Sequence, residues 1–76
     1  MELKEQIKET IVSALNIKPQ ELKEGVSLEN SLGVDSTEMV ELTVALSKKF
    51  NIKLADKEIS KTSTLGDIEN VVKSKL

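Results

Sequence analysis

The sequence predicts a small all-α protein, a four-helix bundle with three longer helices and one short helix, in a single domain over residues 1–76. Three observations lead to this fold class. Apolar residues recur every three or four positions in three stretches, which is typical of amphipathic helices. Capping residues precede two of these stretches. No run alternates apolar and polar residues for long enough to build a sheet, and 76 residues are too few for two domains.

The first helix is expected over residues 2–15. Charged and polar residues, mostly Glu, Lys and Gln, fill the positions between its apolar ones. Asn16 and then Pro19 end the helix, because proline cannot continue a helical hydrogen-bond pattern. The apolar positions at helical spacing are Leu3, Ile7, Ile11, Ala14 and Leu15.

A long loop, NIKPQELKEGVSLENSLGV, connects the first and second helices over residues 16–34. Loops of this length are uncommon in compact domains, and they tend to be functional or packed by their own side chains. Scattered apolar residues predict that this loop packs onto the bundle. The stretch PQELK is expected to form one helical turn.

The second helix is expected from Ser36 to about residue 49. Asp35 is a suitable N-cap, and Glu38 stands at the capping-box position. One side of the helical wheel is mostly apolar and is expected to face the core, with Met39, Leu42, Thr43, Leu46 and Phe50. The opposite, outward side is mixed, with Thr37, Glu41 and Lys48, flanked by Glu38, Val44 and Ala45.

Two more helices are expected further along the chain. Asp56 is expected to cap the short helix, over residues 57–61, which carries Ile59. Thr64 is expected to cap the last helix, with Asp67 at the capping-box position. The apolar stripe of this last helix consists of Leu65, Ile68, Val71 and Val72.

The composition excludes several classes of function. The chain has no His and no Cys, so the usual general bases, thiol nucleophiles and zinc ligands are missing. It has no Arg, one aromatic residue and a net charge of −2, so it lacks the features of nucleic-acid binders. No apolar run is long enough to span a membrane, and the N-terminus is not a signal peptide. We therefore expect a cytoplasmic, non-enzymatic protein with no nucleic-acid or membrane partner.

Ser36 has two interpretations at this point. It stands at the first position of the second helix, directly behind the Asp35 cap. Asp35, Ser36, Thr37 and Glu38 together account for ordinary capping chemistry, in which the serine has no further role. Alternatively, the serine is an attachment point exposed at the positive end of the helix dipole, where an attached phosphate is favoured.

The stretch LGVDSTEMVELTVALSKKFNIKLADKEISKTSTLGDIENVV resembles the acyl carrier protein family, and the similarity extends over nearly the whole chain. At the family's modification site the matching positions are Gly33, Asp35 and Ser36. The resemblance implies that Ser36 carries 4'-phosphopantetheine, whose thiol holds acyl chains as thioesters. It also implies that a phosphopantetheinyl transferase recognises Asp35, and that the protein is a monomer that needs no catalytic residue of its own.

The resemblance further implies a docking face for partner enzymes, namely acyl-transfer enzymes, ketosynthases or other acyl-processing enzymes of fatty-acid or polyketide synthesis. Two features differ from the carriers of fatty-acid synthesis. Thr37 replaces their usual Leu, and Lys48 and Lys49 interrupt a helix that is acidic in those carriers. A specialised carrier is therefore at least as well supported as a housekeeping one. The residues expected on the docking face are Thr37, Glu38, Glu41, Val44, Lys48 and Asp56.

Other functions remain open for this sequence. A small helical interaction module without a prosthetic group would use the same outward face, with Ser36 as a capping residue only. Within the carrier class, peptidyl and D-alanyl carriers share the fold and the attachment serine. The stretch Leu32-Gly33-Val34-Asp35 differs from the usual Gly-Gly motif of peptidyl carriers and favours acyl cargo.

Overall fold

The computed structural model describes residues 2–55 and 57–76, and the only regular elements in them are helices. This confirms the predicted all-α class, and the three longer helices match their predicted ranges closely. None of the helices in the described ranges is long and apolar enough to cross a membrane. The elements are α1 (Leu3–Leu15), a 3₁₀ turn η1 (Pro19–Glu21), α2 (Leu28–Leu32), α3 (Ser36–Phe50) and α4 (Leu65–Lys75).

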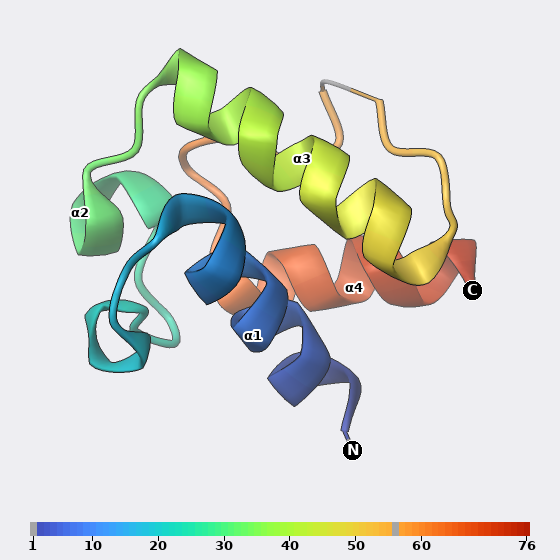
Figure 1. The fold of residues 1–76 in the computed structure, drawn as a ribbon, viewed down its shortest axis with the longest axis horizontal. Coiled ribbons are helices and arrows are strands. Elements are labelled where there is room, and N and C mark those ends of the chain that lie inside the picture. The colour runs from blue at the N-terminus through green and yellow to red at the C-terminus, as the bar shows by residue number, and fades with distance from the viewer. Residues whose placement is uncertain (1, 56) are drawn as a thin grey trace.

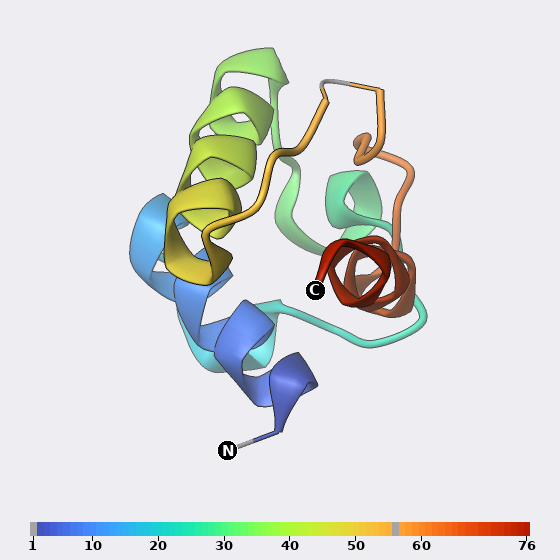
Figure 2. The same cartoon turned by 90° about the vertical axis from the view of Figure 1, so that its right-hand side faces the viewer.

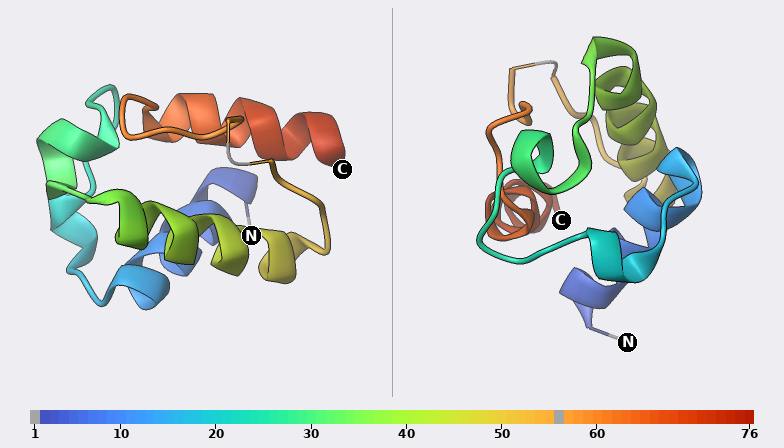
Figure 3. Two further views of the ribbon diagram at one scale, coloured as in Figure 1. Left: turned by 90° about the horizontal axis from the view of Figure 1, so that it is seen from above. Right: turned by 90° about the vertical axis from the view of Figure 1, so that its left-hand side faces the viewer.

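The first helix of the bundle contacts the last one, and the directions of the helices determine the course of the connection between α3 and α4. α1 packs against both α3 and α4. Figure 1 and the left view of Figure 3 show α3 and α4 running in the same direction, with α1 running the opposite way. The connection between α3 and α4 must therefore return along the bundle, as Figure 2 also shows. We call residues 57–63 of this connection the return segment. They lie at the end of the bundle where α3 begins.

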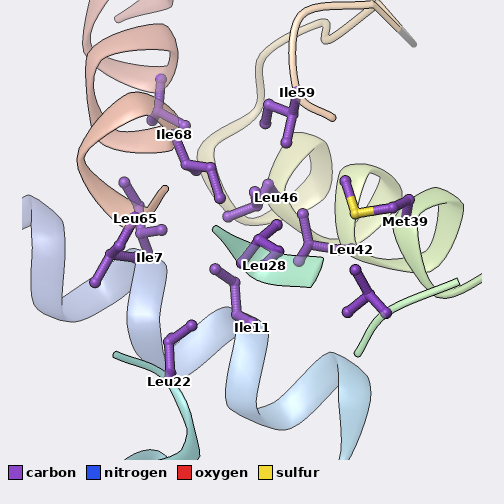
Figure 4. Close-up of a cluster of buried hydrophobic side chains, with 12 residues drawn as sticks. Ile7, Ile11, Leu22, Leu28, Met39, Leu42, Leu46, Ile59, Leu65 and Ile68 are labelled. Atoms are coloured by element: carbon purple, nitrogen blue, oxygen red, sulfur yellow. The ribbon is translucent and has the colours of Figure 1, made fainter. Parts of the chain in front are cut away.

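The core lies between the apolar faces of the helices (Figure 4). No polar or charged side chain is buried in the described part of the chain. Burial of each large aliphatic side chain contributes about 1.5–3 kcal/mol, so this cluster is the main source of stability. It confirms the core faces predicted for α1, α3 and α4. Its members are Ile7, Ile11, Leu22, Leu28, Val34, Met39, Leu42, Leu46, Ile59, Leu65, Ile68 and Val72.

The helix predicted over residues 57–61 is wrong, because the return segment consists of turns. The Ser63 N–H donates to the Ser60 carbonyl over 3.0 Å, and the Ser60 N–H donates to the Ser63 hydroxyl over 3.1 Å. Hydroxyl side chains offer the backbone local partners that compete with helical hydrogen bonds, which explains the difference. Asp56, the expected cap of this helix, lies outside the described residues.

The short helix is instead α2, inside the connection predicted to be a loop. The Ser27 hydroxyl caps it by accepting a hydrogen bond from the Asn30 N–H over 3.2 Å. Leu28 is fully buried, and Gly33 ends the helix in the left-handed region with φ of 66°. The single turn expected in PQELK is present as η1. The loop therefore packs onto the bundle as predicted, but it contains a helix that the sequence reading missed.

Two ion pairs fasten outlying segments to the helices. The Lys4 Nζ lies 3.2 Å from the Glu24 Oε1, and this hydrogen bond together with the charge of Glu24 raises the pKa of Lys4. The Lys75 Nζ lies 2.7 Å from the Glu58 Oε1, which ties the return segment to the last turn of α4. Both pairs are partly exposed, so each contributes only modestly to stability.

Candidate functional site

The first turn of α3 is fixed by a complete capping box, as the sequence predicts. The Asp35 Oδ1 accepts a hydrogen bond from the Glu38 N–H over 2.8 Å. The Asp35 N–H donates in return to the Glu38 Oε1 over 3.1 Å. Each carboxylate therefore accepts a hydrogen bond from a backbone N–H group at the start of the helix. Because Val34 is buried directly before this box, the chain enters α3 in a defined position.

Ser36 is the first residue of α3, and its side chain is exposed. Its hydroxyl makes no hydrogen bond to any residue in the described ranges. The capping box holds the backbone on both sides of it. The fold therefore presents an exposed hydroxyl at a backbone position that the capping box fixes.

An open pocket of about 330 Å³ lies beside Ser36, between α3 and the return segment. This volume is within the range of small-molecule sites in proteins. Two of its lining residues, Met39 and Ile59, also belong to the buried core, and Figure 4 shows them on facing segments of the chain. Ser60 and Lys61 are exposed. The described residues that line it are Ser36, Met39, Val40, Thr43, Ile59, Ser60 and Lys61.

The far side of this pocket is not evident from the sequence. The sequence predicts Ile59 on a helix and no role for Ser60 or Lys61, because nothing in the local pattern reveals which segment returns to the start of α3. Val40 was also missed as a site residue. Its side chain is 59% exposed although it is apolar, and an apolar residue next to the predicted outward face is a signal that the sequence does contain.

Five of the six residues expected on the docking face belong to α3. Thr37, Glu41, Val44 and Lys48 are exposed, whereas Glu38 is half-buried in the capping box. Val44 is 46% exposed. A shallow hollow of about 440 Å³ runs along this surface and is lined by Ala14, Val40, Glu41, Val44, Ala45 and Lys48. Asp56, the remaining residue expected on this face, lies outside the described residues.

The charge along α3 changes sign between its ends. Glu38 lies in the first turn, and Lys48 and Lys49 lie in the last turn. This order is favourable for the helix dipole at both ends. In residues 2–55 and 57–76, no group of three or more Asp and Glu side chains is placed to hold a metal ion. The chemical features of this region are therefore an exposed hydroxyl, a partly apolar pocket and a charged helix surface with two exposed valines.

Comparison with known proteins agrees with these features. Residues 5–72 match the family described as "Phosphopantetheine attachment site". The chain is 40% identical over 74 residues to the acyl carrier protein of Wolinella succinogenes, with 97% of each chain covered. It is 41% identical over 75 residues to that of a Sulfurovum species, covering 93% of this chain and all of the relative. It is 39% identical over 70 residues to that of Clostridium acetobutylicum, covering 92% of this chain and 91% of the relative.

Proposed function

The chain belongs to the acyl carrier protein family, and on that premise we propose that Ser36 carries its 4'-phosphopantetheine group and that acyl chains are bound to this group as thioesters. The observation that supports Ser36 is its exposed, unengaged hydroxyl at the capped start of α3, beside a pocket with apolar lining residues. Ser36 matches the family's attachment serine in sequence as well.

The residues around Ser36 fit such a group. When bound, the group supplies the thiol that forms the thioester. Asp35 and Glu38 fix the backbone from which the arm extends. Met39, Val40 and Ile59 offer an apolar surface beside the attachment point, against which the arm and its acyl chain could lie. In this role the protein acts on nothing itself but presents cargo to a phosphopantetheinyl transferase and to acyl-processing enzymes.

The attachment site is tested by incubating the apo protein with coenzyme A, Mg²⁺ and a promiscuous phosphopantetheinyl transferase, and following its intact mass. The wild-type protein should gain the mass of one arm, and Ser36→Ala should gain none. The matched control is Ser60→Ala, which removes another exposed hydroxyl from the same pocket and should leave the gain intact. A gain in Ser36→Ala would refute the assignment. An absence of any gain in the wild type would support an interaction module without a prosthetic group.

The docking face for partner enzymes is the second part of this proposal. It consists of Thr37, Glu38, Glu41, Val44, Lys48 and Asp56, to which the structure leads us to add Val40. The two exposed valines give a partner an apolar contact close to Ser36. The charged residues around them affect encounter rate and discrimination more than affinity.

We further propose that the chain serves a specialised acyl pathway rather than housekeeping fatty-acid synthesis. Lys48 and Lys49 should repel the basic docking patches of ordinary fatty-acid enzymes, which would suppress wrong partners. These lysines also stabilise the C-terminal end of α3 by about 0.3–1 kcal/mol each, so their replacement changes stability as well as charge. A test of the pathway must separate these two effects.

The test measures turnover of the loaded carrier by a generic ketosynthase. The double change Lys48→Glu and Lys49→Glu should raise turnover, and Thr37→Leu should raise it further. The gain should shrink with added salt, since exposed charges are screened beyond about 8 Å at physiological ionic strength. Lys73→Glu, in the last turn of α4, is the control for lost helix stability and should give no gain. If the wild type is already as good a substrate as the triple variant, the chain is a housekeeping carrier.

A further inference from the structure

We propose that Lys61 binds the phosphodiester that joins the prosthetic arm to Ser36, and that this contact turns the arm toward the pocket. The inference rests on the proposed function, because it needs an arm on Ser36. It assigns a ligand to a residue that lies far from Ser36 in the sequence but lines the same pocket.

The charge of Lys61 is opposite to that of a phosphodiester. A phosphodiester on Ser36 adds a negative charge to a helix end that already holds the carboxylates of Asp35 and Glu38. Both carboxylates accept backbone hydrogen bonds in the capping box, so the phosphodiester does not displace either of them from the helix end. Among the described residues that line the pocket, Lys61 is the one with a charged side chain, and its charge is positive. Its ammonium group forms no ion pair or hydrogen bond with the described residues and is exposed.

The backbone of Lys61 is held in place. The Lys61 carbonyl accepts a hydrogen bond from the Glu29 N–H over 2.9 Å. The Ser63 carbonyl accepts one from the Leu28 N–H over 3.0 Å. Lys61 also lies inside a tight turn, which two hydrogen bonds between Ser60 and Ser63 close. The lysine therefore extends from a fixed point, and a fixed backbone lowers the entropy cost of pairing.

Lys61 lies on one particular side of α3. It lines the pocket beside Ser36 but does not line the hollow along the outer surface of α3. A phosphodiester drawn toward Lys61 therefore directs the arm across Met39 and Ile59 and away from Glu41. A lysine ammonium suits this contact, because it binds a phosphate as a point charge with freely rotating donors.

The absence of cysteine makes this inference directly testable, since the thiol of the arm is the only thiol in the modified protein. A nitroxide label is attached to that thiol, and its relaxation effect on backbone amide signals is measured by NMR. In the wild-type protein the effect should be concentrated at residues 59–63. Lys61→Gln should redistribute it toward residues 44–48, on the outer side of α3, by about 1.4- to fivefold, the range expected for loss of one exposed ion pair.

The control variants separate charge from other effects of substitution. Lys61→Arg should retain the wild-type pattern, because it keeps the positive charge. Lys57→Gln removes an exposed lysine from the same segment that does not line the pocket, and it should change nothing. High salt should reproduce the effect of Lys61→Gln in the wild-type protein.

The proposal is overturned if Lys61→Gln leaves the relaxation pattern unchanged, or if Lys57→Gln shifts it equally. Thermal unfolding of each variant checks that the fold persists, as expected for exposed side chains. Failure of the proposed function is recognised earlier and separately, because a protein without an arm on Ser36 shows no gain in intact mass and takes up no label.

Discussion

The two sides of the pocket beside Ser36 are held in different ways. On the α3 side, the positions of the residues follow from hydrogen bonds between close neighbours in sequence. The Ser27 cap begins α2, Gly33 ends it, and the box of Asp35 and Glu38 begins α3. On the opposite side, the return segment belongs to a connection without a helix in its described residues. It is held mostly by contacts with distant parts of the chain.

Those distant contacts are of three kinds. The Ile59 side chain is only 3% exposed and enters the core cluster. The carbonyls of Lys61 and Ser63 accept hydrogen bonds from the start of α2. Glu58 pairs with Lys75 of α4. One side of the site is therefore specified by local capping, whereas the other side forms only when the helices of the bundle have packed together. Substitutions can test this difference from both sides.

The largest expected effect comes from Ile59→Ala, which removes the buried anchor of the return segment. It should lower the free energy of unfolding by about 2–5 kcal/mol, the cost typical of truncating a buried aliphatic side chain. Denaturant unfolding followed by circular dichroism measures this, because the chain has no Trp or Tyr to report by fluorescence. Val40→Ala, an exposed residue on the other side of the pocket, is the control and should cost no more than about 0.5 kcal/mol.

If Ile59→Ala destabilises the protein too far to be measured, Ile59→Val gives a milder version with an expected loss of about 0.5–1.5 kcal/mol. A loss from Ile59→Ala no greater than that from Val40→Ala would show that the buried side chain does not hold the return segment.

The next effect concerns the local side of the pocket. Asp35→Ala should lower the free energy of unfolding by about 1 kcal/mol through loss of the cap. It should also slow arm transfer to Ser36 more than this loss explains, because we propose that the transferase contacts Asp35. Thr64→Ala is a matched control, since the Thr64 hydroxyl caps α4 by accepting a hydrogen bond from the Asp67 N–H over 3.2 Å. It should cost similar stability but leave the transfer rate unchanged.

Glu38→Ala completes this experiment, because it removes the reciprocal half of the α3 box and leaves Asp35 in place. Modification rates and thermal melts are compared across the three variants. Equal and small effects of Asp35→Ala and Glu38→Ala on the transfer rate would mean that Asp35 is a capping residue only.

The smallest effect is expected from the ion pair between Glu58 and Lys75. A double-mutant cycle with Glu58→Gln and Lys75→Met should give a coupling energy of about 0.2–1 kcal/mol, as for other partly exposed pairs. The cycle on Lys4 and Glu24 is the control for a pair remote from Ser36.

If acyl chains displace the return segment, breaking the Glu58 pair should also change the melting temperature difference between acylated and unmodified protein. Breaking the Lys4 pair should leave that difference unchanged.

The local side of the site was predictable from the sequence because its capping interactions join residues no more than four positions apart. The Asp35 and Thr64 capping boxes, the core face of α3 and the exposure of Ser36 were all inferred correctly from residue types and spacing. The signals for α2 were also present, with Ser27 as a cap and Gly33 as a terminator. They were missed because five residues provide too little periodicity to distinguish a short helix from a packed loop.

The return segment was not predictable in the same way. The sequence shows that Ile59 is apolar, but it does not show that this stretch forms turns. The hydrogen bond from the Ser60 N–H to the Ser63 hydroxyl replaces a helical one, and apolar periodicity gives no sign of it. Its position opposite Ser36 follows from α3 and α4 running in the same direction, which is a property of the whole fold. The lining residues Ser60 and Lys61 therefore required the structure.

The hydrogen bonds that Leu28 and Glu29 donate to the return segment have a consequence for measurement. The first N–H groups of a helix normally face water and lose their hydrogens to it quickly. Here these two amides are bonded to the Ser63 and Lys61 carbonyls, at 3.0 and 2.9 Å. Their hydrogens should exchange with deuterated solvent mainly when the return segment lifts away. The exchange rates of these two amides in α2 thus measure how often the return segment moves away and the pocket opens, and the measurement needs no label.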